Sequence, residues 1–206
     1  MLANAVHFGH RATKWNPRMK PYIYSEINGI HLFDLEKTKD HLEKLLDYIK
    51  RIMEEEKTIL LVSTKPQTAE MIPKLAEIHD FPYVTKKWFG GTLTNFDTMK
   101  ERIRYYKNLK EQQETGEFEK FTKKERVKLE KEIEKLGNAL GGVQSMRRLP
   151  DALFVVDGKR DLIAIREARK LKIPVIGICD TNADPHLYDL FVPANDDAMK
   201  SLSYLL

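Results

Sequence analysis

Three short apolar runs constrain the fold of this chain more strongly than any other feature. They are TILLVS at 58–63, ALFVVD at 152–157 and PVIGICD at 174–180, and all are rich in branched side chains. A short run that is apolar throughout indicates a strand buried on both faces. Helical patterns lie between the runs, and this alternation predicts an α/β fold with a parallel sheet flanked by helices.

The remaining patterns complete this α/β body. Leucine and isoleucine recur at helical spacing over 38–56, with Thr38 as the expected N-cap. The other predicted elements are helices at 67–79, 161–171 and 195–206, and short strands at 81–85 and 190–194.

The segment 97–136 differs from the rest, because nearly every other residue is charged and the two signs almost balance. Two lines of apolar residues run through it: Met99, Ile103 and Tyr106, then Leu129, Ile133, Leu136 and Leu140. Such narrow lines predict two helices zipped into an antiparallel, coiled-coil-like hairpin. We therefore expect a body of residues 1–96 and 137–206, with the hairpin 97–136 inserted between its halves.

Composition narrows the classes of protein. Hydrophobic residues make up 42% of the 206 residues, enough for a buried core. The single cysteine, Cys179, lies in an apolar run and is expected to be a buried thiol in a reducing compartment. No apolar run approaches the roughly 18 residues of a membrane helix, and the start MLANAV does not resemble a targeting peptide. The net charge of +4 is mildly basic, so the position of the charge matters more than its sum.

The segment HFGHRATKWNPRMKPYIY at 7–24 combines aromatic rings with cations and contains no acid. Its candidate RNA-binding residues are Arg11, Lys14, Trp15, Asn16, Arg18 and Lys20. Cations neutralise phosphates, and aromatic rings stack on unpaired bases, which favours a basic N-terminal arm that binds nucleic acid. Pro17 breaks any amphipathic helix here and argues against a membrane-surface role.

Two further loops repeat this chemistry, TKKWFGGTLTNF at 85–96 and GGVQSMRRLP at 141–150. Their candidate RNA-binding residues are Lys86, Lys87, Trp88, Gly90, Gly91, Thr94 and Asn95 in the first, and Arg147 and Arg148 in the second. The glycines let bare backbone approach a phosphate closely. Trp88 has a second interpretation, as a packing anchor where the hairpin joins the body, and each loop alone could be ordinary solvated surface.

A metal site is a further hypothesis. His10, Asp180, Asp196 and Asp197 offer the ligands of a mixed histidine and carboxylate site, provided that the fold brings the two ends of the chain together. In the competing interpretation, Asp196 and Asp197 occupy the first turn of the last helix, where acids suit the helix dipole.

An enzyme is the alternative class. Ser63, Asp157 and Asp180 follow three predicted strands, and ligands of parallel sheets bind beyond the carboxyl ends of the strands. Such a pocket would hold a phosphosugar or a nucleotide. However, the sequence contains neither glycine-rich motif that marks dinucleotide-binding or P-loop proteins.

Several of these stretches together resemble one family. HFGH with TKWNPRMKPYIY, NGIHLFDLEKT, KKWFGGTLTNF, ALGGVQSMRRLPDALFVVD, AIREARKLKIPVIGICDTNADP and VPANDDAMKS occur in order between about residue 5 and residue 202. They resemble the bacterial-type small-subunit ribosomal protein S two family. The resemblance implies a Rossmann-like body with an inserted helical hairpin, a structural role in the small ribosomal subunit, no catalysis and no required cofactor.

The resemblance also implies partners. These are small-subunit rRNA, neighbouring small-subunit ribosomal proteins and, in bacteria, the large multi-domain protein S one, with no membrane and no small-molecule substrate. The matched motifs carry the RNA-binding expectation to all three loops, including Pro17, Gly141 and Gly142. The implied location is the bacterial cytoplasm, or the stroma or matrix of an organelle. Because the charge of the hairpin is balanced, we expect the hairpin to bind RNA less well than the arm and to contact protein over part of its surface.

Overall fold

The three apolar runs form the central strands of one parallel sheet. In a computed structural model that describes residues 1–206, they are β4 (Ile59–Val62), β6 (Ala152–Val155) and β7 (Val175–Cys179), and every residue in them is buried. The strands β5 (Tyr83–Val84) and β8 (Leu190–Pro193) complete the order β5-β4-β6-β7-β8. All four pairings are parallel, as predicted.

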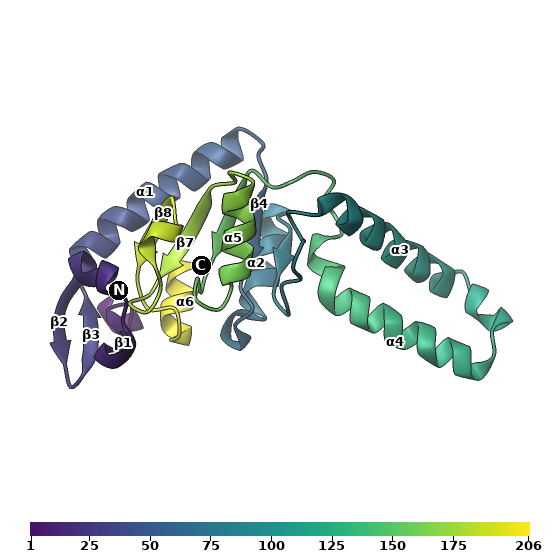
Figure 1. The fold of residues 1–206 in the computed structure, drawn as a ribbon, viewed down its shortest axis with the longest axis horizontal. Coiled ribbons are helices and arrows are strands. Elements are labelled where there is room, and N and C mark those ends of the chain that lie inside the picture. The colour runs from purple at the N-terminus through teal and green to yellow at the C-terminus, as the bar shows by residue number, and fades with distance from the viewer.

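Helices cover both faces of this sheet (Figure 1). The helix α5 (Leu162–Lys170) packs on one face, against alternate strand residues such as Leu60 and Leu153. The helices α1 (Leu35–Glu54), α2 (Met71–His79) and α6 (Met199–Leu205) pack on the other, against residues such as Leu61 and Phe154. The α/β fold class is therefore confirmed. None of the helices has the length and apolar character needed to cross a bilayer.

Three predicted helix starts were wrong, and one of them is that of α2, which was predicted from residue 67 but begins at Met71. The helix α1 begins after Asp34, whose carboxylate accepts from the N–H groups of Glu36 and Lys37. Thr38 is instead fully buried, and its hydroxyl donates to the Pro193 carbonyl 2.7 Å away. The helix α6 starts only at Met199, because the segment from Asn195 forms a separate turn closed by the side chain of Asn195.

A small antiparallel sheet occupies the segment in which we predicted only a basic arm. Its strands are β1 (Phe8–Arg11), β2 (Ile23–Ile27) and β3 (Ile30–Phe33), in the order β1-β3-β2. Asn28 and Gly29 join β2 to β3 with φ of 52° and 74°, a two-residue turn in which both positions have positive φ. The sequence Asn-Gly was the available signal for this hairpin.

The charged segment forms two long antiparallel helices that project from the body (Figure 1), α3 (Phe96–Glu114) and α4 (Lys123–Leu140). Thr122 and Glu125 form a reciprocal capping box at the start of α4. At the base of the hairpin, Met99, Tyr106 and other seam residues belong to the same buried cluster as α5. The hairpin is thus continuous with the core of the body.

Short 3-10 turns connect these elements, at Leu2–Asn4, Ala12–Lys14, Pro17–Tyr22, Pro66–Thr68, Glu117–Lys120, Gly141–Val143 and Pro185–Leu187.

Candidate functional site

The basic segment 7–24 is anchored to the body along its length. The backbone N–H groups of His10 and Asn16 donate to Thr181, just beyond β7, over 2.8 and 2.7 Å. Met19 is fully buried, and Trp15 packs edge-on against His31 with 4.8 Å between ring centroids. The cations of this segment therefore stand on a fixed loop.

Three of these cations are unpaired. Arg11, Lys14 and Lys20 are exposed, and no ion pair involves them. Arg18 differs, because its Nη1 lies 2.5 Å from the Asp184 carboxylate. The side chain of Asn16 accepts from the Arg18 N–H and so caps the following 3-10 turn.

The loop 88–94 is organised by one buried carboxylate, Glu167 of α5. Its Oε1 accepts from the indole N–H of Trp88 over 3.0 Å and from the N–H of Gly91 over 2.8 Å. Its Oε2 accepts from the N–H of Leu93 and from both the N–H and hydroxyl of Thr94 over 2.9–3.1 Å. Burial alone raises the pKa of Glu167, but the bonds from Trp88 and the backbone outweigh it and hold the pKa below its usual value.

The candidate RNA-binding residues of the loop 85–96 fall into two groups, one buried against the body and one exposed to solvent. Trp88 is buried, and its indole N–H donates to Glu167, as expected of a packing anchor. Lys86, Lys87 and Gly90 face solvent. Asn95 is exposed at the start of α3 and accepts from the Thr98 hydroxyl.

The third loop lies beside the second, at the base of the hairpin. Gly142 packs so closely on Tyr83 that a Cβ would lie 2.3 Å from the Tyr83 carbonyl oxygen. Lys86 and Gly142 line one shared cavity of about 230 Å³. Arg147 is exposed and unpaired, whereas Arg148 lies 3.3 Å from Asp151.

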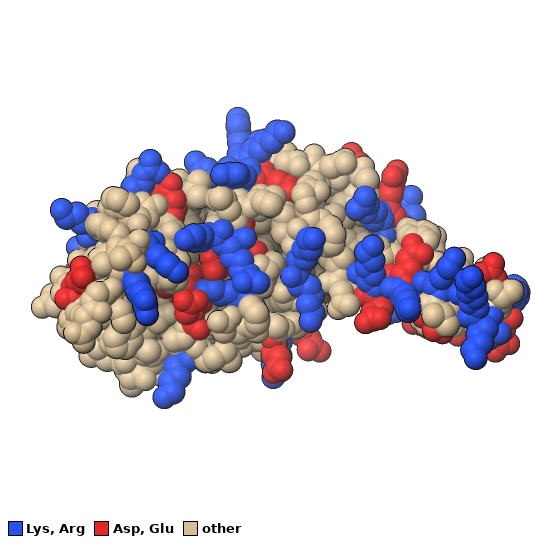
Figure 2. Space-filling view, turned by 60° about the horizontal axis from the view of Figure 1, so that its bottom comes forward, with Lys and Arg blue, Asp and Glu red and all other residues tan.

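The basic segment 7–24 lies at the other end of the body from the hairpin (Figure 1). The structure thus brings the second and third loops together and holds the first apart. In the space-filling view, Lys and Arg side chains spread over the body and along the hairpin, with acids between them (Figure 2).

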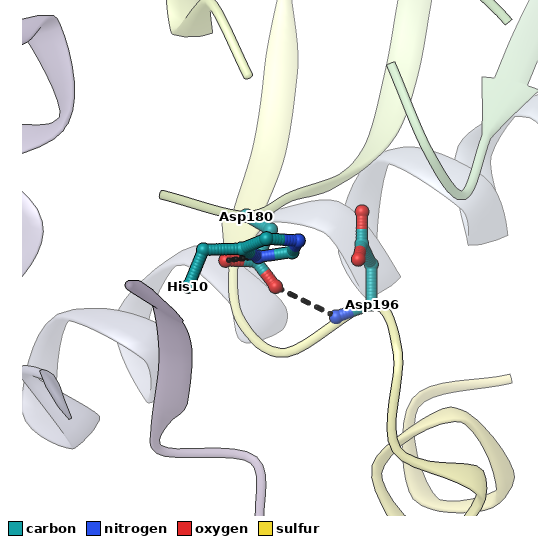
Figure 3. Close-up of side chains that lie close together, drawn as sticks. All are labelled: His10, Asp180 and Asp196. Atoms are coloured by element: carbon teal, nitrogen blue, oxygen red, sulfur yellow. Dashed lines mark hydrogen bonds and ion pairs between the residues drawn. The ribbon is translucent and has the colours of Figure 1, made fainter. Parts of the chain in front are cut away.

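The predicted histidine and carboxylate cluster is assembled at the carboxyl edge of the sheet (Figure 3). His10 comes from β1, Asp180 follows β7 and Asp196 follows β8, and one ligand atom of each lies within 4.8 Å of the others. The two ring nitrogens of His10 lie 3.0 Å from Asp180 and 3.2 Å from Asp197. Asp196 and Asp197 precede α6, so the interpretation that placed them in its first turn was wrong.

Lys65, which sequence reasoning did not single out, joins the same cluster from the loop after β4. Its ammonium lies 2.5 Å from Asp196, 2.7 Å from Asp197 and 3.1 Å from Asp157. Burial disfavours the charged ammonium, yet these carboxylates raise the pKa of Lys65 well above its usual value. Lys65 is therefore a buried, permanently charged partner of the acids.

The remaining groups of the cluster have shifted pKa values. The bond to Asp180 raises the pKa of His10 despite partial burial. Burial raises the pKa of Asp196 far above its usual value, and the neighbouring Asp180 adds to this effect. The Oδ2 of Asp196 is buried and has no hydrogen-bond partner.

The residues predicted to line an enzyme pocket form contacts within the protein instead. Ser63 and Asp180 are at most 1% exposed. The Ser63 hydroxyl accepts from Thr68, and the Asp180 carboxylate accepts from the N–H groups of Thr181 and Asp196. Asp157 accepts from the two backbone N–H groups that follow Gly158. None of the three predicted pocket residues lines any of the five principal cavities.

Glu167 and Lys65 are the structural residues that sequence reasoning missed. Glu167 falls at helical spacing with the buried Ala164 and Ala168, so a carboxylate on the apolar face of 161–171 was a readable signal. Lys65 carried no comparable signal, since polar residues after a strand are also what a turn requires.

Comparison with known proteins agrees with this fold. Residues 1–206 match the family model described as Ribosomal protein S2. A relative named "Small ribosomal subunit protein uS2" from Roseiflexus sp. (strain RS-1) is 46% identical over 202 residues, which cover 98% of this chain and 77% of the relative.

Proposed function

The chain belongs to the ribosomal protein S2 family and is a structural constituent of the small ribosomal subunit, and from this premise we propose that it binds the rRNA of that subunit as a rigid, non-catalytic scaffold. The observation that carries the proposal is the set of unpaired cations on anchored loops. Arg11, Lys14 and Lys20 stand on the segment tied to Thr181, and Lys86 and Lys87 flank the loop held by Glu167.

Fixed cations suit this role, because neutralising phosphates with a preordered surface avoids the entropy of ordering a flexible arm. The cations of this surface bind the RNA backbone, and amide donors such as the half-buried Asn16 and the exposed Asn95 position it. Trp88 supports the loop from within, while Lys86, Lys87 and Gly90 meet the RNA.

No cofactor is required for this role, and the residues of the enzyme alternative line none of the five principal cavities. The proposed partners besides rRNA are neighbouring small-subunit proteins and, in a bacterium, the large multi-domain protein S one. The proposed location follows the ribosome, in the bacterial cytoplasm or in the stroma or matrix of an organelle.

A structural metal ion is the second part of the proposal, with His10, Asp180, Asp196 and Asp197 as its ligands. The supporting observation is the buried Oδ2 of Asp196, which has no hydrogen-bond partner, in a carboxylate that offers a ligand atom within 4.8 Å of those of His10 and Asp180. Nitrogen and oxygen ligands suit Zn²⁺. Lys65 neutralises part of the acid charge, and we expect the ion to bind on the His10 side of the cluster.

Zinc titration by calorimetry tests this second part. We expect one site in the unmodified chain, its loss in Asp180→Asn, and its retention in Asp47→Asn, which removes an exposed acid from α1. An unmodified chain that takes up no zinc contradicts the metal proposal.

Charge reversal tests the RNA proposal. Arg11→Glu with Lys14→Glu should weaken binding to small-subunit rRNA and flatten its salt dependence, because two phosphate contacts are lost. Lys44→Glu with Lys50→Glu is the matched control, since both are exposed lysines of α1. Equal binding by the two double variants, with circular dichroism unchanged, would remove the basic segment from the RNA-binding surface.

A further inference from the structure

A row of lysines without any acid among them runs along the outer side of α4. We call it the lysine face, and its members are Lys124, Lys128, Lys131 and Lys135. At about 100° per residue, their spacing of four, three and four places them within about 60° of arc, spread over about 16 Å of helix. All four are exposed, and the seam residues Ile133 and Leu140 point away from them toward α3.

The acids of α4 lie outside this arc, and the structure uses two of them elsewhere. Glu125 closes the capping box with Thr122. Glu132 accepts from the hydroxyl of Tyr105, which ties α4 to α3 over 3.2 Å. The ion pair within the hairpin joins Asp97 to Lys100, and none involves the lysine face. Although the total charge of the hairpin is nearly balanced, the acids of α4 and the four lysines of the lysine face therefore lie on different sides of the helix.

The lysine face is also accessible. The hairpin extends away from the body (Figure 1), and in the space-filling view Lys and Arg side chains lie along it with acids between them (Figure 2). Apart from the four lysines, no residue of α4 falls within the arc, so the face has no apolar centre. Lysine is depleted from protein–protein interfaces, whose centres are apolar.

We propose that the lysine face of α4 lies along a phosphate backbone of the small-subunit rRNA and forms a second RNA contact, remote from the basic segment 7–24. The inference rests on the proposed function and revises the expectation that balanced charge directs the hairpin to protein. Unpaired lysines at regular intervals match a polyanion, and they meet phosphates without reading bases.

Rebinding of the full chain to small subunits washed free of it tests the inference. Lys128→Gln with Lys131→Gln removes two charges from the face and keeps helix propensity nearly unchanged. Each phosphate contact steepens the salt dependence by about 0.7–0.9 in log–log slope, so the variant should lose about 1.5 units of slope and bind roughly 30-fold more weakly at about 0.1 M salt. The control Lys44→Gln with Lys50→Gln has the same charge change on α1 and should bind like the unmodified chain.

The outcomes separate this inference from the proposed function. If the unmodified chain rebinds with a steep salt dependence and the Lys128 and Lys131 variant rebinds identically, the inference is overturned and the proposed function stands. If the unmodified chain does not bind rRNA, both are overturned.

A second measurement distinguishes RNA from a protein partner. Cys179 is buried, so Lys131→Cys supplies the accessible thiol for a tethered iron chelate. In reassembled subunits, hydroxyl radicals from position 131 should cut the rRNA backbone, and radicals from Lys44→Cys should not. Absence of rRNA cleavage from position 131, with crosslinking there to a ribosomal protein, overturns the inference.

Discussion

Replacing Glu167 tests whether one carboxylate holds the loop 88–94 in place. Of its five donors, the indole N–H of Trp88 and the N–H of Leu93 sit in buried bonds, and the other three donor groups are partly accessible to water. In Glu167→Ala the two buried donors lose their acceptor, and each orphaned donor costs about 1–3 kcal/mol. We therefore expect a loss of about 4 kcal/mol in the free energy of unfolding.

Glu167→Gln should cost about half as much. The amide oxygen can still accept from Trp88 and Gly91, while its NH2 group then faces the N–H groups of Leu93 and Thr94. Urea unfolding measures both losses. Glu77→Ala, at an exposed position on α2, is the control and should lie within about 0.5 kcal/mol of the unmodified chain.

The pH dependence gives an independent check. Because the folded pKa of Glu167 is depressed, the stability it contributes is present above the pKa of the unfolded chain and is lost as pH falls through the folded value. The difference between the unmodified chain and Glu167→Gln should therefore shrink in acid. A loss below about 1 kcal/mol in Glu167→Ala, or a difference independent of pH, refutes the assignment of Glu167 as the organiser of the loop.

Three further predictions follow from burial, backbone conformation and capping. Lys65→Met should lower the unfolding free energy by about 3 kcal/mol in urea, because it leaves the acids around Asp196 uncompensated, and a neutral effect would contradict the ion cluster. Gly177→Ala should abolish or greatly reduce the yield of folded protein, since Gly177 has a φ of 148° and a Cβ would lie 1.9 Å from the Val155 carbonyl; native-like circular dichroism would refute this. Thr122→Ala should lower stability by about 1 kcal/mol through loss of the cap of α4, measured as a shift in Tm.

The body was predictable because its strands carry their burial in the sequence. The four residues of β4, Ile59–Val62, are all apolar, as a strand covered on both faces requires. The small sheet was not predicted, because the turn at Asn28 and Gly29 was its one clear sequence signal. Its strands are mostly half-exposed, and a half-exposed strand leaves a weaker pattern than a buried one.

The sequence also predicted only part of the histidine and carboxylate cluster. His10 and Asp180 are far apart in the sequence, and only the pairing of β1 with the loop after β7 brings them together. Residue types could suggest the cluster but not Lys65, because a lysine after a strand has the same appearance whether it is solvated or buried. In the hairpin, the periodicity of α4 rather than its composition decides which side chains share a face.

Sedimentation of the full chain with small ribosomal subunits from gently lysed cells, in low and then in high salt, tests the central claim most directly. The account predicts that the chain migrates with the subunits and their rRNA at low salt and is released only by strong salt, because many phosphate contacts hold it. Migration as a free 24.0 kDa species at low salt would contradict the RNA-binding scaffold.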